Sequence, residues 1–446
     1  MSDLGRVLRL DARRTALLVA VPVLTLVGIA AAASSLTPSV AYWDDSVVAL
    51  LDAVRLLGPL AAGLAAWTAV RERPLDYLRH LTARSPATGV LFDLLLLSVA
   101  ALAAYAAVTT VVAGITVVHA AAGGPPALGV VAGAGTLVLH VVAGYLAGRA
   151  FPHRATAAMV LAAASLWSAL RVPGAAWWSL LPPAAFERVH LFAALRPAVL
   201  ADQVALSVGL TAALVLWYVV WATRRLVTVV PLAVAVAVAV IAGVGLYGSG
   251  GGTVSPVPAE PVCREWPLTV CVHPALREAL PALMAVATPL AARLDGTPGA
   301  FTRVEQRPAW IPAEIVDGVA GVHLDEDLAP GFEERAVREI RDGLLDGSAC
   351  AGPRRPVSDG YGGLVDAWLT GEEPPAVPDE RAARRFASWG ELRRREWLRL
   401  RFARYRSCSL GADDFGAGSP GRGLNAYAPR TAPRTTREVG DEKPSA

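Results

Sequence analysis

Long apolar runs follow one another through the first 250 residues of the chain. Seven of them are candidate membrane-spanning segments, at 15–33, 47–70, 89–119, 128–147, 156–172, 204–221 and 227–247. A bilayer core about 30 Å thick is crossed by roughly 20 apolar helical residues, so the fifth run is short and the third is longer than one crossing requires. Backbone in hydrocarbon must satisfy its own hydrogen bonds, which makes each run a predicted helix. The pattern predicts an α-helical polytopic membrane domain, with six to seven transmembrane helices, over residues 1–247.

The pattern changes after the seventh run. Residues 268–272 alternate as in a strand, and the residues that follow repeat apolar positions at helical spacing. Further strands and helices are expected near 301–306, 319–324, 333–345 and 379–407. We therefore expect a flexible Gly-rich linker at 248–261, a small mixed α/β domain at 262–410, and a disordered tail at 411–446, which has few apolar side chains.

The composition supports the membrane class. Hydrophobic residues make up 54% of the chain and charged residues only 18%, which is too apolar for a soluble protein of 446 residues. The formal net charge of +3 gives no reason to expect nucleic-acid binding. The bias toward Ala, Val, Leu, Gly, Pro and Arg is typical of a GC-rich bacterial genome, so we expect a bacterial plasma-membrane protein.

The arginines indicate the orientation of the spans. Twelve lie on one side of the predicted membrane domain, at positions 6, 9, 13, 14, 71, 73, 79, 84, 149, 154, 224 and 225, whereas the other side has three, at 171, 188 and 196. Cytoplasmic loops carry the excess of basic residues, which places the amino terminus in the cytoplasm. Seven spans then leave the carboxy-terminal domain outside the cell. An alternative reading of the start is a cleaved signal peptide, because arginines precede an apolar run that ends in Ala31-Ala32-Ala33.

All four cysteines lie in the region expected outside the membrane. Disulfides persist in oxidising compartments. Among the three possible pairings we favour Cys263–Cys271 and Cys350–Cys408, because the first pair closes a short loop and the second brackets the helical carboxy-terminal region. Four free thiols in a cytoplasmic domain are the alternative. A zinc site at Cys263, Cys271 and His273 is a weaker interpretation, because neighbouring positions of a strand point to opposite faces. We expect no metal and no cofactor.

Three polar side chains inside the predicted spans are candidates for function, because charges in hydrocarbon are costly. Asp52 and Arg55 lie three residues apart on one helical face, where they either pair with each other or line a polar path. His140 lies within the fourth run, and we favour a buried histidine bonded to a neighbouring helix over a proton relay.

The loop at 71–86 has more pattern than a connection between two spans requires. It reads Arg-Glu-Arg-Pro-Leu-Asp-Tyr-Leu-Arg-His-Leu-Thr-Ala-Arg-Ser-Pro, with leucines at 75, 78 and 81 and charged residues between them. Pro74 is suited to a first helical turn and Ser85-Pro86 to a helix end. The loop predicts a short amphipathic helix that could present a docking surface to a cytoplasmic partner.

With an amino-terminal interfacial helix and two spans before it, this loop resembles that of the permease subunits of type-2 ABC transporters. The layout resembles actinobacterial permease-like proteins that carry an appended outer domain. The resemblance implies an export permease that forms a homodimer or heterodimer in the lipid bilayer and recruits a separate cytoplasmic ATPase. It implies ATPase-coupling contacts at Arg73, Asp76, Tyr77, Arg79 and Arg84. Typical permeases of this type have six spans and no large outer domain, and this chain departs from both features.

The sequence has no phosphate-binding Gly-x-x-x-x-Gly-Lys-[Ser/Thr] motif, so a nucleotide would have to bind a separate subunit. Ser407, His323 and Asp325 could in principle form a hydrolytic triad, but their sequence context does not select them, and we expect no enzymatic activity. The competing hypothesis is a membrane-anchored sensor, adaptor or inactive peptidase-like protein that acts through its extracytoplasmic domain.

Overall fold

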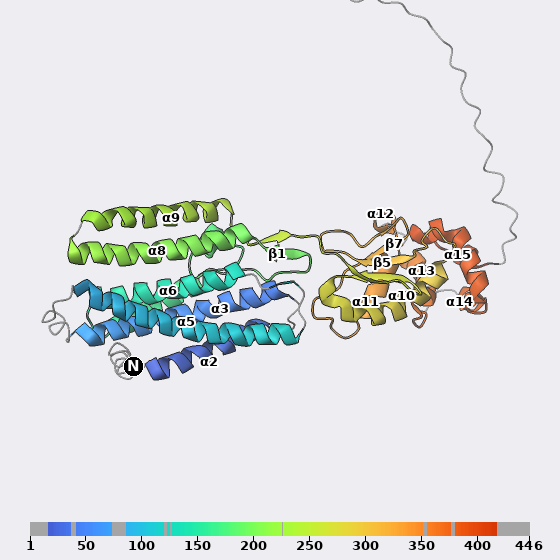
Figure 1. Ribbon diagram of the computed structural model, residues 1–446. Coiled ribbons are helices and arrows are strands. Elements are labelled where there is room, and N and C mark those ends of the chain that lie inside the picture. The colour runs from blue at the N-terminus through green and yellow to red at the C-terminus, as the bar shows by residue number, and fades with distance from the viewer. Residues whose placement is uncertain are drawn as a thin grey trace, which may run out of the picture. The chain divides into compact units, whose positions relative to one another are not determined.

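The computed structural model describes residues 17–36, 42–73, 86–119, 123–124, 127–224, 226–350, 355–375 and 380–416. The chain divides into two compact units (Figure 1). The first unit comprises residues 1–284, 304–312 and 321–336, and the second comprises residues 285–303, 313–320 and 337–446.

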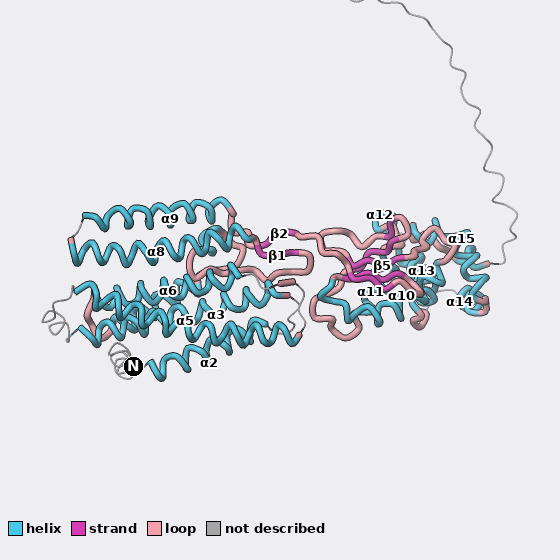
Figure 2. The backbone as a smooth tube through the Cα atoms, in the orientation of Figure 1, coloured by secondary structure: helices cyan, strands magenta, loops and turns pink. Residues whose placement is uncertain are grey.

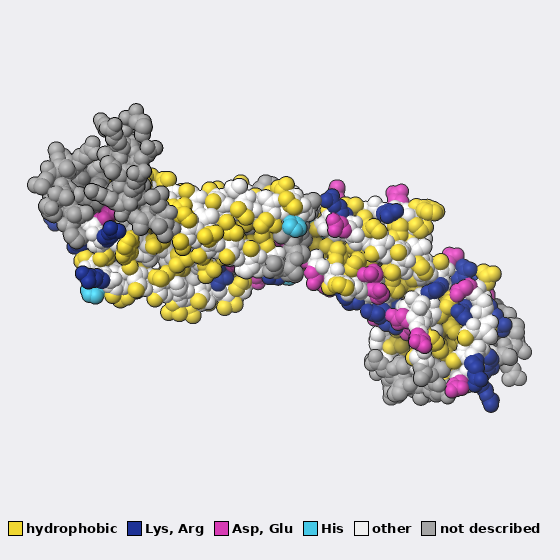
Figure 3. All heavy atoms as spheres, turned by 90° about the horizontal axis from the view of Figure 1, so that it is seen from below, with side chains coloured by type: hydrophobic (Ala, Val, Ile, Leu, Met, Phe, Trp, Pro, Cys, Tyr) yellow, Lys and Arg dark blue, Asp and Glu magenta, His cyan; other side chains and the backbone are white. Residues whose placement is uncertain are grey.

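The first unit is built mainly from long apolar helices. These are α2 (Leu17–Leu36), α3 (Trp43–Glu72), α5 (Pro86–Val118), α6 (Ala127–Ala150), α7 (Thr156–Ala169), α8 (Pro197–Thr223) and α9 (Val229–Gly248). The face shown in Figure 3 has hydrophobic side chains over most of this helical part and charged side chains gathered near one of its ends. The polytopic helical class predicted from the apolar runs agrees with this architecture.

Six helices among the described residues are long and apolar enough to cross a membrane. Five correspond to predicted runs, namely α3, α5, α6, α8 and the helical stretch that ends in α9. The sixth, Pro274–Leu294, is the helix that we assigned to the α/β domain. The two remaining predicted runs form shorter apolar helices, Ala20–Leu36 and Thr156–Ala169. The short fifth run is therefore a helix of 14 residues.

The packing of α3 against α6 depends on small residues. A side chain at Gly144 would clash with the backbone of Ala62, and one at Gly148 would lie 2.5 Å from the carbonyl oxygen of Ala66. The two backbones can approach closely only because both positions lack a Cβ atom, as is common between membrane helices. On the same stretch of α6, Tyr145 is fully buried and donates a 2.7 Å hydrogen bond to Asp93 of α5.

A two-stranded sheet connects the start of α8 to the segment after α9. Strand β1 (Ala193–Leu195) pairs antiparallel with β2 (Val254–Pro256). Strand β2 lies within residues 248–261, the segment expected to be a linker. Backbone hydrogen bonds thus hold part of that segment to the loop that precedes α8.

A five-stranded sheet follows, with its strands in magenta around the label β5 in Figure 2. Its strand order is β3-β4-β5-β7-β6. Its strands are β3 (Val262–Arg264), β4 (Thr269–Val272), β5 (Arg303–Gln306), β6 (Ile315–Val316) and β7 (Val319–Val322). The alternating pattern predicted at 268–272 corresponds to β4, whose last three residues are buried. The outer pairs β3–β4 and β6–β7 are antiparallel.

The remaining elements are mostly helical. They are η4 (Pro274–Ala279), α10 (Leu280–Leu294), α11 (Phe332–Asp342), α12 (Gly347–Cys350), α13 (Arg355–Thr370), α14 (Glu380–Ala387), α15 (Glu391–Arg406) and η5 (Ala412–Phe415). The helix predicted over 379–407 is thus divided in two, and Gly390 precedes the second part. Around Phe386, the rings of Trp368, Trp389, Trp397 and Phe415 have centroids within 5.9 Å of its own. This aromatic cluster forms part of the interior of the second unit.

Candidate functional site

A polar cavity of about 640 Å³ lies in the first unit. We call it the polar cavity. It is bordered by the end of α2, the start of α3, residues 188–192, and the two segments 306–310 and 323–327. Its charged and titratable lining residues are Asp45, Asp52, Arg188, His190, Arg307, His323, Asp325, Glu326 and Asp327. Carboxylates outnumber arginines in this lining.

Three carboxylates hold the backbone of the segment beside the cavity, residues 188–195, which we call the clamped loop. Asp44 accepts a hydrogen bond from the amide of Leu195 at 3.0 Å, and Asp45 accepts one from the amide of Val189 at 3.2 Å. Glu326 accepts a third from the amide of Leu191 at 3.0 Å. Two of these carboxylates lie in the first turn of α3. The clamped loop is therefore fixed both to α3 and to the segment that follows β7.

His190 is a second partner of Glu326. Its Nδ1 lies 3.7 Å from a Glu326 carboxylate oxygen, and its side chain is largely exposed. The interaction gains ionic character when the imidazole is protonated. The carboxylates around the clamped loop thus accept hydrogen bonds from backbone amides, and one of them lies within ion-pair distance of a histidine.

His273, at the end of β4, lies at a junction of the same unit. Its ring contacts the edges of Tyr42 and Phe192, with centroid distances of 5.3 and 5.0 Å. Its amide donates to the side chain of Gln306, and its Nδ1 accepts a 3.2 Å hydrogen bond from the amide of Ala275 at the start of η4. Burial lowers the pKa of His273, because the charged imidazolium loses its hydration there. The neutral ring is the form that can accept the Ala275 amide.

The predicted pair in the second span lies at the edge of this region. Arg55 Nη1 is 3.4 Å from Asp52 Oδ1, and Asp52 lines the polar cavity. The other end of the guanidinium donates to the carbonyls of Ser168 and Arg171, at 3.1 and 2.9 Å. The Ser168 hydroxyl donates to the carbonyl of Arg55 in return. Arg55 therefore connects α3 to the end of α7 in addition to its contact with Asp52.

Arg171 is a feature that our sequence reasoning did not identify. It is only 2% exposed, and its guanidinium lies 3.8 Å from the ring centroid of Trp167 and 5.5 Å from that of Trp178. Among the described residues, none forms a hydrogen bond with its three guanidinium nitrogens. Contact with aromatic faces favours a cation. Trp167 and Arg171 are four residues apart in the fifth predicted run, and this spacing was the available signal.

His140 is buried within the helical part, but its hydrogen bond differs from our expectation. Its Nδ1 lies 2.8 Å from the carbonyl oxygen of Thr136, one turn earlier in the same helix. The ring also covers Gly58 of α3, where a Cβ atom would lie 3.1 Å from it. His140 thus contacts the neighbouring helix by packing and bonds to its own helix.

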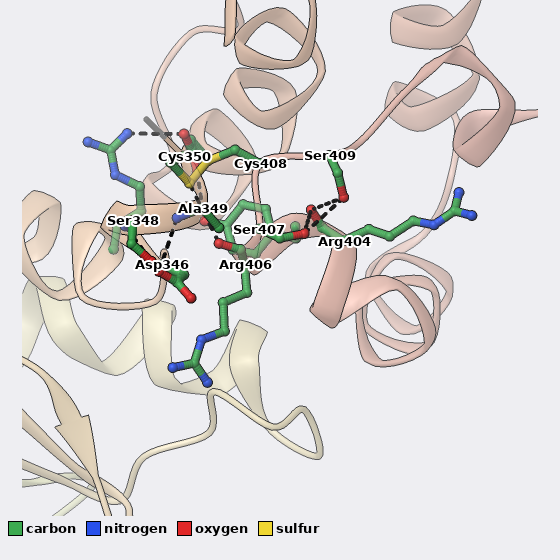
Figure 4. Close-up of a disulfide and its surroundings, with 12 residues drawn as sticks. Asp346, Ser348, Ala349, Cys350, Arg404, Arg406, Ser407, Cys408 and Ser409 are labelled. Carbon is green, nitrogen blue, oxygen red and sulfur yellow. Dashed lines mark hydrogen bonds and ion pairs between the residues drawn. A yellow bond between two sulfur atoms is a disulfide. The ribbon is translucent and has the colours of Figure 1, made fainter. Parts of the chain in front are cut away.

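Both favoured disulfides are present. Cys263 and Cys271 face each other across β3 and β4, with Cα atoms 4.1 Å apart. Cys350, at the end of α12, bonds to Cys408 after α15, with Cα atoms 5.1 Å apart (Figure 4). The zinc interpretation would need both Cys263 and Cys271 as thiolates, and the disulfide occupies them. Within the described ranges, no three His, Cys, Asp or Glu side chains are grouped to hold a metal ion.

The surroundings of Cys350 are ordered by Asp346. Its carboxylate accepts hydrogen bonds from the amides of Ser348 and Ala349 and from the Ser348 hydroxyl, which lower its pKa (Figure 4). The amide of Asp346 in turn donates to the carbonyl of Arg406, at 2.8 Å. The two halves of the disulfide are therefore also joined by backbone.

The predicted coupling loop lies mostly outside the described residues. Asp76, Tyr77, Arg79 and Arg84 fall in this part and remain predictions. Arg73 is described, and its Nη1 donates to the carbonyl oxygen of Arg149 at 2.5 Å. Arg73 thus connects the end of α3 to the last turn of α6.

The residues considered for hydrolysis have other partners. The hydroxyl of Ser407 donates to the carbonyl of Ala403 at 2.9 Å, and His323 Nε2 lies 2.8 Å from the carbonyl oxygen of Ile311. Each of these two side chains therefore has a backbone carbonyl as a partner.

No protein-family model, curated protein or solved structure matches the chain. The class is therefore defined by the molecule itself: a helical protein with six described helices long and apolar enough to cross a membrane, and a small disulfide-bonded sheet region.

Proposed function

We propose that this chain is the membrane-embedded permease subunit of an ABC-type exporter, driven by a separate cytoplasmic ATPase through the 71–86 loop. The observation that carries the proposal is the course of α3. This helix begins at the polar cavity and ends where the loop starts, and its 30 residues span about 45 Å. A displacement of the loop would reach the cavity through one continuous helix.

Both ends of α3 are attached to neighbouring elements. At the loop end, Arg73 donates to the last turn of α6. At the cavity end, Asp44 and Asp45 hold the clamped loop, and Arg55 is bonded to the end of α7. Movement of α3 would therefore shift α6 and the wall of the cavity together, which is what coupling between an ATPase and a transport path requires.

The charge pattern supports the orientation of this arrangement. The arginine-rich end of the helices would lie in the cytoplasm, where an ATPase subunit has access to ATP. The cavity and the two disulfides would then face the oxidising side of a bacterial plasma membrane. A second permease chain, identical or different, would complete the translocation path.

The test is affinity purification of the tagged full chain in mild detergent, with mass spectrometry of the retained proteins. We expect a stoichiometric ATPase that is lost from the variant Arg79→Glu/Arg84→Glu. The matched control is Arg154→Glu, which reverses an exposed charge on the same side of the membrane, outside the loop. A clean preparation without an ATPase, or one in which both variants behave alike, would contradict the proposal.

A second candidate function is a sensor or adaptor that acts through the extracytoplasmic domain. Two interactions of Glu326 favour this function. Glu326 follows β7, and it contacts Leu191 and His190 of the clamped loop. These interactions provide a physical route from the sheet region to α3. This candidate requires a preparation that lacks an ATPase, so the purification above separates the two functions.

A further inference from the structure

A second cavity of the first unit lies at the opposite end of the helices from the polar cavity. Its volume is about 520 Å³, and it lies between the last turns of α6 and α8. We call it the α6–α8 pocket. Its lining residues in the described part of the chain are Arg73, Leu146, Arg149, Ala150, Trp217, Tyr218 and Trp221. It combines two arginines, three aromatic residues and two aliphatic side chains, with no carboxylate among these residues.

The two arginines give the pocket its charge. Arg149 lies in the last turn of α6, and Arg73 reaches it from the end of α3 by donating to its carbonyl oxygen. A guanidinium has five N–H donors in a planar arrangement that suits phosphate oxygens, and this hydrogen bond uses one donor of Arg73. Both arginines are among the residues that line the pocket. Their charges would favour an anion there.

The aromatic residues indicate the depth of the pocket in a membrane. Trp217 and Trp221 lie one turn apart on α8 and are 62% and 73% exposed, on the surface of a helix long and apolar enough to cross a bilayer. Trp and Tyr are enriched where the hydrocarbon meets the lipid headgroups. The ring of Tyr218 is near that of Trp221, at a centroid distance of 6.3 Å. An occupant would thus meet arginines at headgroup level and indole rings along its glycerol and acyl parts.

We infer that the α6–α8 pocket binds the phosphate headgroup of an anionic glycerophospholipid, with Arg149 and Arg73 on the phosphate and Trp217 and Trp221 along the acyl chains. Basic pockets between membrane helices on the cytoplasmic side are suited to anionic headgroups. A zwitterionic lipid brings its own cation and would gain less from the arginines. A soluble anion would leave the exposed indoles without an apolar partner. The inference is independent of the proposed transport function, because it depends on the pocket alone.

The test uses native mass spectrometry of the full chain in mild detergent, titrated with dioleoyl phosphatidylglycerol or dioleoyl phosphatidylcholine. The acyl chains of the two probes are identical, so the comparison isolates the headgroup. We expect tighter binding of phosphatidylglycerol. Arg149→Gln should weaken that binding about fivefold, because one arginine near a lipid surface contributes about that factor, and should weaken phosphatidylcholine binding less. Arg154→Gln, at an exposed arginine outside the pocket, should change neither.

A second variant keeps the test decisive if Arg149→Gln does not fold. Trp221→Ala removes a largely exposed ring and should weaken both lipids while the protein stays monodisperse. Equal binding of the two lipids by the wild-type chain, or equal binding of phosphatidylglycerol by the wild type and Arg149→Gln, would overturn the inference. Displacement of phosphatidylglycerol by excess inorganic phosphate would also overturn it, since the pocket would then be a simple anion site. A wild-type preparation that contains no ATPase but still binds phosphatidylglycerol would reject only the transport proposal.

Discussion

The long helices of the first unit and the helices of the second unit bury polar groups in different ways. In the long helices, several hydroxyl groups bond to the carbonyl four residues earlier, as those of Thr25, Thr109 and Thr116 do. In the second unit, a buried carboxylate collects several donors: Asp414 is 3.1 Å from Arg401, 2.6 Å from Arg404 and 3.0 Å from the amide of Gly411. In a region that faces hydrocarbon, no water is present to hydrate a polar group that loses its partner. Short hydroxyl side chains bonded to their own helix keep their partner at all times.

The two regions also fill space differently. The α3–α6 contact excludes side chains altogether at Gly144 and Gly148, so that backbone meets backbone. The second unit surrounds Phe386 with large rings. The hydrophobic effect between helices is weak in a membrane, so the helical part gains stability from the close approach of its backbones. The second unit gains stability by removing large aromatic surfaces from water.

The largest expected effect on stability comes from placing a side chain between the closely packed backbones of α3 and α6. In Gly144→Val, the new side chain has no room beside the backbone of Ala62, so α6 must move away from α3. We expect a loss of about 3 kcal/mol, the upper range for overpacking a closely packed interior. Thermal unfolding in mild detergent, followed by tryptophan fluorescence, measures it. The control is Gly114→Val on α5, where an added Cβ meets nothing within 4 Å. Equal effects of the two changes would contradict the role assigned to backbone approach.

A smaller effect is expected from the charged cluster of the second unit. Asp414→Ala removes the acceptor shared by Arg404, Arg401 and the Gly411 amide, and should cost about 2 kcal/mol, as expected for a buried hydrogen bond to a charged group. Hydrogen exchange of α15 is the measurement, because local opening of that helix should increase. Asp413→Ala, at the exposed neighbouring carboxylate, should leave the exchange unchanged. A similar increase in both variants would show that the carboxylate of Asp414 has no special role.

The smallest effect is a pH dependence that involves neither of these two regions. Because burial lowers the pKa of His273, the neutral ring is favoured in the folded protein, and its contribution is present above the ordinary histidine pKa of 6.5. That contribution is lost as the pH falls through the lowered pKa, when a proton on Nδ1 also displaces the Ala275 amide. Unfolding temperatures measured from neutral to mildly acidic pH should fall less in His273→Gln. His153→Gln, at an exposed histidine, should retain the wild-type pH profile.

Much of the helical part could be predicted from the sequence. Crossing hydrocarbon demands a continuous apolar run, and this demand leaves a local signal that does not depend on distant residues. The disulfide pairing was also accessible, because all four cysteines lie beyond residue 262 and the pairing we favoured is the one present. Helix α13 was missed because glycines at 360, 362 and 363 have weak helix propensity, which tertiary packing overrides.

The candidate site could be predicted only in part. Asp52 and Arg55 were identified by the cost of charge in a span, but the polar cavity is assembled from separate segments that have no common sequence signal. The clamped loop depends on backbone amides, whose partners cannot be read from side-chain types. Likewise, the α6–α8 pocket brings together the ends of three helices. Such convergence is a property of the fold and is absent from any single stretch of sequence.

The disulfide between Cys350 and Cys408 has a consequence for how the protein is made. Its two cysteines are 58 residues apart, and the second follows α15, the last long helix of the described chain. The ribosome must therefore synthesise the chain as far as residue 408 before this covalent bond can form, so helices α13 to α15 are complete while the thiol of Cys350 is still reduced. Heterologous production will accordingly depend on the thiol-oxidation machinery of the host, and a strain that lacks disulfide catalysts should accumulate chains with a protease-sensitive carboxy-terminal part.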